Sequence, residues 1–348
     1  MPMRRLLLSC VLAAATLTQS GGFDTQSAQK TVPVPTLQKE RVEMRVVHVV
    51  NSRLPRMSAD QLQTLLASLR ETVKQNFGVH LVFTKIDEAS IESTFAPIPS
   101  KRLDWARANR FDFKSGKADP EKLRKAFASE FAKSKESLSS QIQFARPHVP
   151  GLRDDFSAEQ FGWRMADVQL QRLARWSQVK GLDGNPVIDA TDHNEYLAWL
   201  VLGYTDLPYE LVITNQIIAG AEFLGTAVHS ALRGGYTNGI TTYSKASRYG
   251  TAAIWSTFAF TGNDDFSVQM RDGETYDASE AARLAGTAAA HEIGHQLFHL
   301  LHPFARPECI MNPVPMFTYR AWANKLSPSD CRLESDPAMT PGASTFNY

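Results

Sequence analysis

Residues 291–303 read HEIGHQLFHLLHP, which places four histidines and one glutamate within thirteen positions. In a helix, His291 and His295 are four residues apart, so both imidazoles lie on one face, within reach of a single ion. Glu292 lies about 100° around the helix from His291, so its carboxylate stands beside that ion without binding it. This spacing is typical of a zinc site whose glutamate acts as a general base.

A third ligand has to come from farther along the chain, and His299 and His302 are the candidates. In an unbroken helix His302 would lie ~16 Å along the axis from His291, whereas a zinc–nitrogen bond is ~2 Å long. Pro303 disfavours helical dihedrals at His302, so the helix has to end before it. No glycine is present at the turn, and histidine is among the residue types enriched in the left-handed conformation. We therefore expect His299 to form the turn and His302 to be the third ligand.

Two other interpretations of these histidines stay open. In one, His299 is the third ligand and His302 takes no part. In the other, the extra histidines complete an amphipathic helix and bind nothing. The remaining histidines are scattered, and each is expected to be a surface or hydrogen-bonded core residue: His48, His80, His148, His193 and His229.

The longer segment HEIGHQLFHLLHPFARPECIMNP, residues 291–313, resembles the zinc site of the metzincin metallopeptidases. Their pattern is H-E-x-x-H-x-x-G-x-x-H, followed by a methionine in a tight turn beneath the metal. Gly294, at the second x of H-E-x-x-H, is also common in that family. The pattern carries over to five residues of this chain: His291, Glu292, His295, His302 and Met311.

The chain departs from the metzincin pattern at three points. Phe298 stands where the family has glycine, His302 comes one residue late, and no tyrosine follows Met311 two positions later. The resemblance is close over about 23 residues, and it extends loosely to the strands before the helix.

The resemblance implies a secreted metallopeptidase with one Zn²⁺ per chain, which hydrolyses peptide or protein substrates with a zinc-activated water and Glu292 as general base. The strand expected at 251–260, which contains Trp255, would pair with an extended substrate. A gluzincin-type peptidase is one alternative; it needs a downstream glutamate, but Glu308 lies in a Pro-flanked loop and Glu334 has no helical context. A secreted binding protein that keeps a zincin fold without turnover is the other.

The flanking sequence predicts an α+β, metzincin-like domain over 42–348, with a mixed twisted sheet and a long zinc-binding helix. Residues 42–50, 58–78 and 79–86 read as strand, helix and strand, which favours a parallel β-α-β unit. A helical insertion is expected at about 96–205, with helices at 119–145, 157–180 and 191–203. Further strands are expected at 209–218, 234–245 and 251–260. The zinc-binding helix starts at Asp277 or Ser279 as its N-cap.

Composition fits a globular exported protein. The chain has 348 residues, 43% of them apolar, and a net charge of +1, and it has no basic block of the kind that binds nucleic acid. Residues 1–20 resemble a signal peptide, with Arg4 and Arg5 before an apolar run that is too short to span a membrane. We expect secretion or a periplasmic location, with lipoprotein anchoring at Cys10 as a lesser alternative. Residues 21–41 read as a tether or short pro-segment.

Losing Cys10 with the signal would leave two cysteines in an oxidising compartment, and Cys309 and Cys331 are therefore expected to form a disulfide. The alternative is a pair of buried, unpaired thiols, because spacing alone does not bring two cysteines together. Neither composition nor spacing fixes the oligomeric state.

Overall fold

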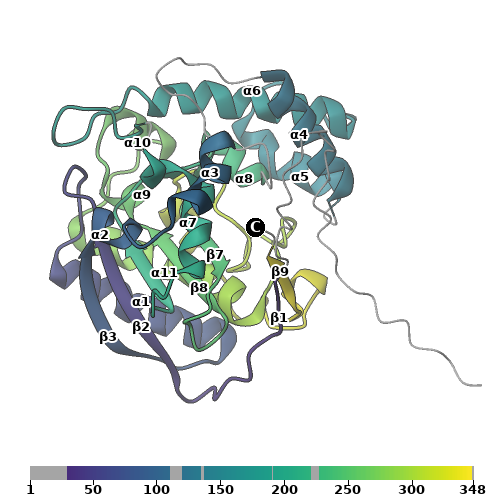
Figure 1. Ribbon diagram of the computed structural model, residues 1–348. Helices are drawn as coiled ribbons and strands as arrows, with labels where there is room; N and C mark the ends of the chain where they lie inside the picture. Colours follow the sequence, from purple (N-terminus) through teal and green to yellow (C-terminus); the bar gives the residue numbers. More distant parts are fainter. Residues whose placement is uncertain (1–29, 110–119, 135–136, 190, 221–226, 347–348) are drawn as a thin grey trace, which may run out of the picture.

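The computed structural model describes residues 30–109, 120–134, 137–189, 191–220 and 227–346 (Figure 1). Over these residues the fold is α+β, as predicted, and is built on a mixed five-stranded sheet in the order β3-β2-β4-β8-β7. β7 runs antiparallel to β8, and the other neighbouring pairs are parallel. The strands are β2 (Val42–Val50), β3 (Leu81–Ser90), β4 (Leu211–Thr214), β7 (Gly239–Tyr243) and β8 (Thr251–Ser256).

The chain enters the sheet through the predicted β-α-β unit. α1 (Ala59–Phe77) joins β2 to β3, and these two strands are parallel. Ser58 caps the helix in a capping box with Gln61, and Gly78 ends it at a φ of 66°. Both ends were predicted correctly because the caps are local: a hydroxyl satisfies the first free N–H groups, and glycine adopts the left-handed turn without strain.

Helices cover both faces of the sheet. Side chains alternate along a strand, so Val46 packs in the core beneath α1 and α11 (Ala278–Phe298), while Val47 packs in the core on the opposite face. That second core is closed by α2 (Ile91–Phe95), α3 (Ser100–Asn109) and α7 (Tyr196–Leu200). The consequence is a sheet whose central strands β2, β4 and β8 are buried on both faces, with α11 packed on one face.

α11 starts at the predicted N-cap, since the Asp277 carboxylate accepts a hydrogen bond from the Glu280 backbone N–H at 2.8 Å. The small residues of this helix allow close packing, as expected. A Cβ added to Gly286 would lie 2.1 Å from the carbonyl oxygen of Leu65 in α1. A side chain at this position would therefore force α1 and α11 apart.

The segment expected as a helical insertion is helical, and it packs into the rest of the fold. Three helices gather with α8 (Val228–Leu232) around a core of their own (Figure 1): α4 (Pro120–Lys133), α5 (Leu138–Ala145) and α6 (Ala158–Trp176). At the end of α6, Trp176 enters the main core, with its ring centroid 4.5 Å from that of Phe266. α6 therefore belongs to both cores, which argues against an independent helical domain.

Several predicted boundaries were wrong. The single helix expected at 119–145 is divided between α4 and α5, and the helix expected at 191–203 is the short α7 followed by a 3₁₀ turn, η3 (Val201–Tyr204). The strand expected at 251–260 ends at Ser256, and α9 (Phe258–Thr261) follows it. Apolar runs such as this one do not distinguish strand from buried helix by periodicity.

Short elements complete the fold. β5 (Ile218–Ala219) pairs with β6 (Tyr236–Thr237), and β1 (Lys30–Val32) pairs with β9 (Ser344–Phe346), so part of the segment expected as a tether is a strand. The predicted signal peptide and Cys10 lie outside the described residues. The remaining helical elements are α10 (Asp265–Met270), α12 (Tyr319–Ala323), η1 (Arg146–His148), η2 (Asp192–Asn194) and η4 (Pro337–Met339).

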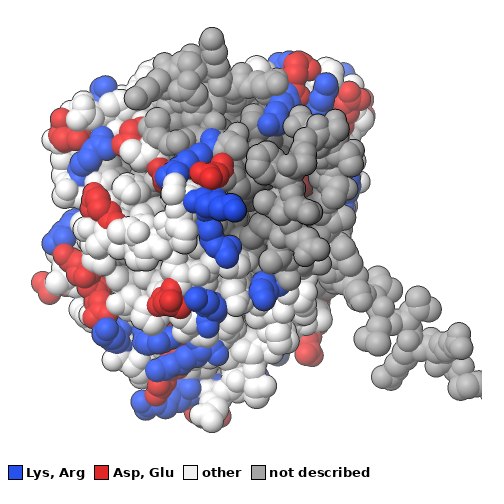
Figure 2. Space-filling view, in the orientation of Figure 1, with Lys and Arg blue, Asp and Glu red and all other residues white. Residues whose placement is uncertain are grey.

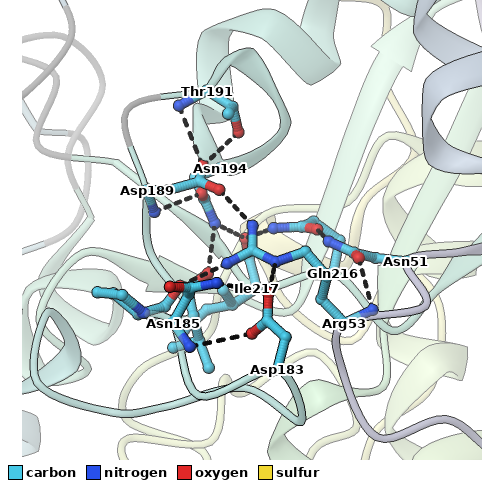
Figure 3. Close-up of polar contacts among 11 residues, drawn as sticks. Asn51, Arg53, Asp183, Asn185, Asp189, Thr191, Asn194, Gln216 and Ile217 are labelled. Carbon is cyan, nitrogen blue, oxygen red and sulfur yellow. Dashed lines mark hydrogen bonds and ion pairs between the residues drawn. The ribbon is translucent and has the colours of Figure 1, made fainter.

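A polar network fastens the last loop of the helical segment to the end of β2 (Figure 3). Arg53 donates to Asp183 at 2.7 Å and to Asp189 at 2.5 Å, and Asn51 donates to Gln216 at 2.8 Å. The Arg53 contacts hold the loop after α6 against the end of β2, and the Asn51 contact connects β2 to the chain just after β4.

The face shown in Figure 2 carries acidic and basic side chains interspersed over the β2, β3 and α1 region, in keeping with the small net charge. Among the described helices, none combines the length and the apolar character that a membrane span needs.

Candidate metal centre

Three histidines converge where α11 ends. His291 and His295 come from α11, and His302 comes from the loop after it. Their Nε2 atoms are 3.0 Å apart for His291 and His295, 3.0 Å for His295 and His302, and 3.2 Å for His291 and His302. A tetrahedral zinc ion with nitrogen ligands at ~2.0–2.1 Å needs nitrogens ~3.3 Å apart, so the spacing fits such an ion closely.

Backbone carbonyls fix which nitrogen of two imidazoles carries the proton. His291 Nδ1 is 2.9 Å from the Ile310 carbonyl oxygen, and His295 Nδ1 is 2.6 Å from that of Leu300. A carbonyl only accepts, so each Nδ1–H donates and each Nε2 presents a lone pair. Two lone pairs at 3.0 Å repel each other unless a cation lies between them, and the residues therefore suit a metal ion.

Burial keeps these imidazoles neutral. It lowers the pKa of His295 to about 4 and holds the pKa values of His291 and His302 well below their ordinary range, with neighbouring histidines adding to the effect on the last two. Neutral imidazole is the form that binds a divalent cation.

The turn that brings His302 back is the predicted one. His299 has φ 55° and ψ 41°, the left-handed conformation, and its backbone N–H donates to the carbonyls of Gly294 and His295. Its Nδ1 lies 2.8 Å from the Gly342 carbonyl oxygen. His299 is outside the group of ligand atoms that could share an ion, and His302 is inside it.

Met311 is fully buried and packs against the helix that carries His291 and His295. A Cβ added to Gly294 would lie 2.3 Å from Met311 Sδ, so the glycine at the second x of H-E-x-x-H lets the methionine pack against the helix. Asn312 connects the segment that carries Met311 to the segment that carries His302. Its Nδ2 donates to the carbonyls of Pro303 and Phe304 at 2.9 and 3.0 Å.

The expected disulfide is present. It joins Cys309 to Cys331 with Cα atoms 4.9 Å apart, an ordinary separation for such a bond. The segment that carries Met311 is therefore anchored covalently two residues before the methionine.

Glu292 stands beside the histidine group and points to β7. Thr241 Oγ1 donates to Glu292 Oε1 at 2.5 Å, and a Cβ added to Gly239 would lie 2.0 Å from Oε2. Burial raises the pKa of this carboxyl to about 7, and the hydrogen bond from Thr241 opposes that rise. A carboxyl group with such a pKa can both accept and release a proton near neutral pH, and Glu292 is outside the group of ligand atoms that could share an ion.

A cavity of about 360 Å³ opens onto these residues. Its lining includes the three histidines, Glu292 and part of β7, together with His229 from α8 and Arg233 from directly after that helix. Because Ser344 and Phe346 also line it, the terminal strand pair β1–β9 borders the site.

His229, expected to be a surface or hydrogen-bonded core histidine, is outside the group that could hold an ion, but it lines the cavity. Its ring centroid is 4.9 Å from that of His302, at an interplanar angle of 80°, and its Nδ1 has no hydrogen-bond partner among the described residues. Neither His229 nor Arg233 belongs to a motif. Packing of α8 against the helical segment brings them to the cavity, and such tertiary packing leaves no signal in local spacing.

The glutamates considered for a gluzincin site do not join the group. Glu308 is paired with Arg306 at 2.9 Å, and Glu334 is in a left-handed turn with φ 67°. Among the described residues, the group that could hold an ion is composed of histidines alone.

Comparison of the chain with protein-family models, with curated proteins and with solved structures gave no match.

Proposed function

We propose that this chain is a metzincin-like zinc metallopeptidase that hydrolyses peptide bonds with Glu292 as general base. The observation that carries the proposal is the meeting of three imidazole Nε2 atoms, all within 3.2 Å of one another, beside one buried carboxylate. Three imidazoles with an open fourth position suit zinc better than calcium or magnesium, which prefer oxygen ligands.

The ion and the side chains would have different roles in peptide hydrolysis. When bound, Zn²⁺ would lower the pKa of a water molecule and polarise the scissile carbonyl. Glu292 would accept the proton from that water and deliver it to the leaving amine. Thr241 keeps the Glu292 carboxylate oriented, and Gly239 leaves room for it beside β7.

The strand expected to pair with a substrate has to be corrected. β8 lies between β4 and β7, so both of its edges are occupied and an added strand cannot reach it. Trp255, on β8, is buried in the main core, although it also borders the cavity. β7 ends the sheet, and its residues Gly239–Thr241 line the cavity. We assign the pairing with an extended peptide to this part of β7.

The test compares the zinc-loaded protein with Glu292→Gln on a set of fluorescence-quenched peptides. The amide keeps the shape of the side chain and removes its basicity. Turnover should fall by about 10²- to 10⁴-fold, the range for loss of a general base, while zinc content stays the same. Peptide cleavage that persists unchanged in the variant would contradict the proposed role of Glu292.

The two rival functions give different results. A secreted binding protein with a zincin fold would bind zinc, and the wild type and Glu292→Gln would be equally inactive. A gluzincin would lose zinc on substitution of Glu308 or Glu334, whereas we expect both substitutions to leave the zinc content unchanged. Export itself stays a prediction, tested by N-terminal sequencing of the mature protein.

A further inference from the structure

The cavity is lined by a buried cation that no carboxylate of the described residues neutralises. Arg233 is 5% exposed, and it forms no ion pair with a described residue. Its guanidinium donates to Asn238 Oδ1 at 3.0 Å and to the Val314 carbonyl oxygen, while Nε has no partner. Arginine carries five N–H groups, so these two acceptors leave much of its donor capacity unused. Buried charges are ordinarily paired, and this one borders open space instead.

The other arginine that is buried among the described residues, Arg271, has a structural role that Arg233 does not share. Arg271 is fully buried, and Nε, Nη1 and Nη2 all donate to oxygen atoms, those of Ala259, Gly262 and Asn263. Its hydrogen bonds are thus satisfied within the fold, away from the cavity. Arg233 is the one lysine or arginine among the described residues that line the cavity.

The charge of the cavity favours an anion. Among its described lining residues, Glu292 is the one carboxylate, and it is engaged by Thr241. A divalent ion at the three histidines would add to the positive charge of Arg233 and leave it well in excess. Guanidinium groups recognise planar anions such as carboxylates through paired hydrogen bonds.

We propose that Arg233 binds a carboxylate of the substrate, so that the enzyme prefers peptides with a carboxylate close to the scissile bond. This inference rests on the proposed peptidase function and names its substrate class. The carboxylate has two possible sources, the C-terminus of the peptide or an Asp or Glu side chain, and both present the same chemistry to the guanidinium.

The experiment uses the zinc-loaded full mature chain and matched peptides of one sequence. One pair differs only in a free or amidated C-terminus, and a second, amidated pair differs in Glu or Gln near the scissile bond. We expect kcat/KM to be about 10- to 100-fold higher for one carboxylate form, the range for a hydrogen bond to a charged group. Most of this difference should be in KM rather than in kcat. A preference in the first pair identifies the C-terminus, and one in the second identifies the side chain.

Variants separate Arg233 from the ion. Arg233→Gln should lose the preference and retain zinc. The control is Arg172→Gln, because Arg172 donates to the Leu232 carbonyl beside Arg233 but does not line the cavity, and this variant should retain the preference. A wild type that treats both members of both pairs alike would overturn the inference, and so would a preference that survives in Arg233→Gln. A uniform fall in kcat for every peptide would also overturn it, because it would mean that Arg233 acts on the reaction rather than on the carboxylate.

Failure of the peptidase proposal would be visible separately, as absence of turnover with every peptide. In that case binding of the same peptides, labelled with fluorescein, is measured by anisotropy. Tighter binding of a carboxylate form that depends on Arg233 would support the anion site, and equal binding of carboxylate and amide would refute it.

Discussion

At the scale of single residues, the site depends on two glycines because they have no side chain. Gly239 and Gly294 each lie where a Cβ would collide with a functional side chain, the carboxylate of Glu292 in one case and the sulfur of Met311 in the other. Both glycines have ordinary backbone dihedrals, since neither is among the residues with positive φ. Their function is therefore close approach rather than conformational freedom.

Gly239→Ala should disturb Glu292, the proposed general base, without lowering the zinc content. Its methyl group would lie 2.0 Å from Glu292 Oε2, so the carboxylate has to move from the position that Thr241 fixes. Because a misplacement of ~1 Å can cost about 10²-fold in rate, we expect kcat to fall by 10-fold or more. Zinc content and melting temperature serve as readouts of the fold. Gly342→Ala is the control, since open space surrounds that position; equal activity of the two variants would contradict this account.

Thr241→Val should slow turnover by about 10-fold, a typical cost of losing a group that orients a catalytic side chain, because valine keeps the shape of threonine but donates no hydrogen bond to Glu292. Thr241→Ser restores the hydroxyl and should restore most of kcat. A serine variant as slow as the valine variant would indicate that packing of β7, and not the hydrogen bond, is what matters.

At the scale of elements, the contact between α11 and α1 positions the histidines, and Gly286 permits it. Replacing an interior helical glycine by alanine ordinarily stabilises a helix by about 1 kcal/mol. Here the new methyl group would meet the backbone of α1, 2.1 Å from the Leu65 carbonyl oxygen. We expect Gly286→Ala to lower the free energy of unfolding by about 1–3 kcal/mol, the usual cost of overpacking. Urea denaturation checks the sign, and a stabilised variant would contradict the packing argument.

The ends of some helices could be predicted from the sequence, whereas the order of the strands could not. The ends of α1 and α11 follow from Ser58, Gly78, Asp277 and His299, because caps and turns act within a few residues. That His299 forms the turn and His302 joins the other two histidines follows from Pro303 for the same reason. The error at β8 has the opposite cause. Which strand ends a sheet depends on pairing between distant segments, such as Ile240 with Ile254, and local periodicity does not report it.

At the scale of the whole molecule, one buried residue, Glu210, connects the sheet to α11. Glu210, which immediately precedes β4, is fully buried and accepts hydrogen bonds from the backbone and guanidinium of Arg45 in β2 at 2.5–3.0 Å. The carbonyl oxygen of the same residue accepts from Gln296 Nε2 at 2.7 Å, directly after His295. The strands and α11 therefore share one buried polar centre.

This centre predicts a pH dependence of stability. Burial raises the pKa of Glu210, but the hydrogen bonds from Arg45 and from the Arg248 backbone outweigh it and leave the pKa below its ordinary value. A carboxyl whose pKa is lower in the folded state stabilises the protein above its unfolded pKa, about 4.3, and this contribution is lost as the pH falls through the folded value. Glu210→Gln should thus be destabilising by about 2–4 kcal/mol at pH 7.

The comparison is made by urea denaturation of wild type and Glu210→Gln at a series of pH values from 7 down to the acid limit of folding. The difference in free energy of unfolding should be constant above pH 5 and should shrink below it. A difference that stays the same throughout would contradict the assignment of a depressed pKa to Glu210.

The central claim is that His291, His295 and His302 hold one zinc ion while His299 only forms the turn. The most direct test is the metal content of the purified protein by elemental analysis, for wild type, His302→Ala and His299→Gly. Glycine suits the left-handed conformation of residue 299 and removes its imidazole, so it leaves the turn intact. We expect one zinc per chain in the wild type and in His299→Gly, and its loss from a folded His302→Ala. A folded wild type without zinc, or zinc that survives in His302→Ala and disappears in His299→Gly, would contradict this claim.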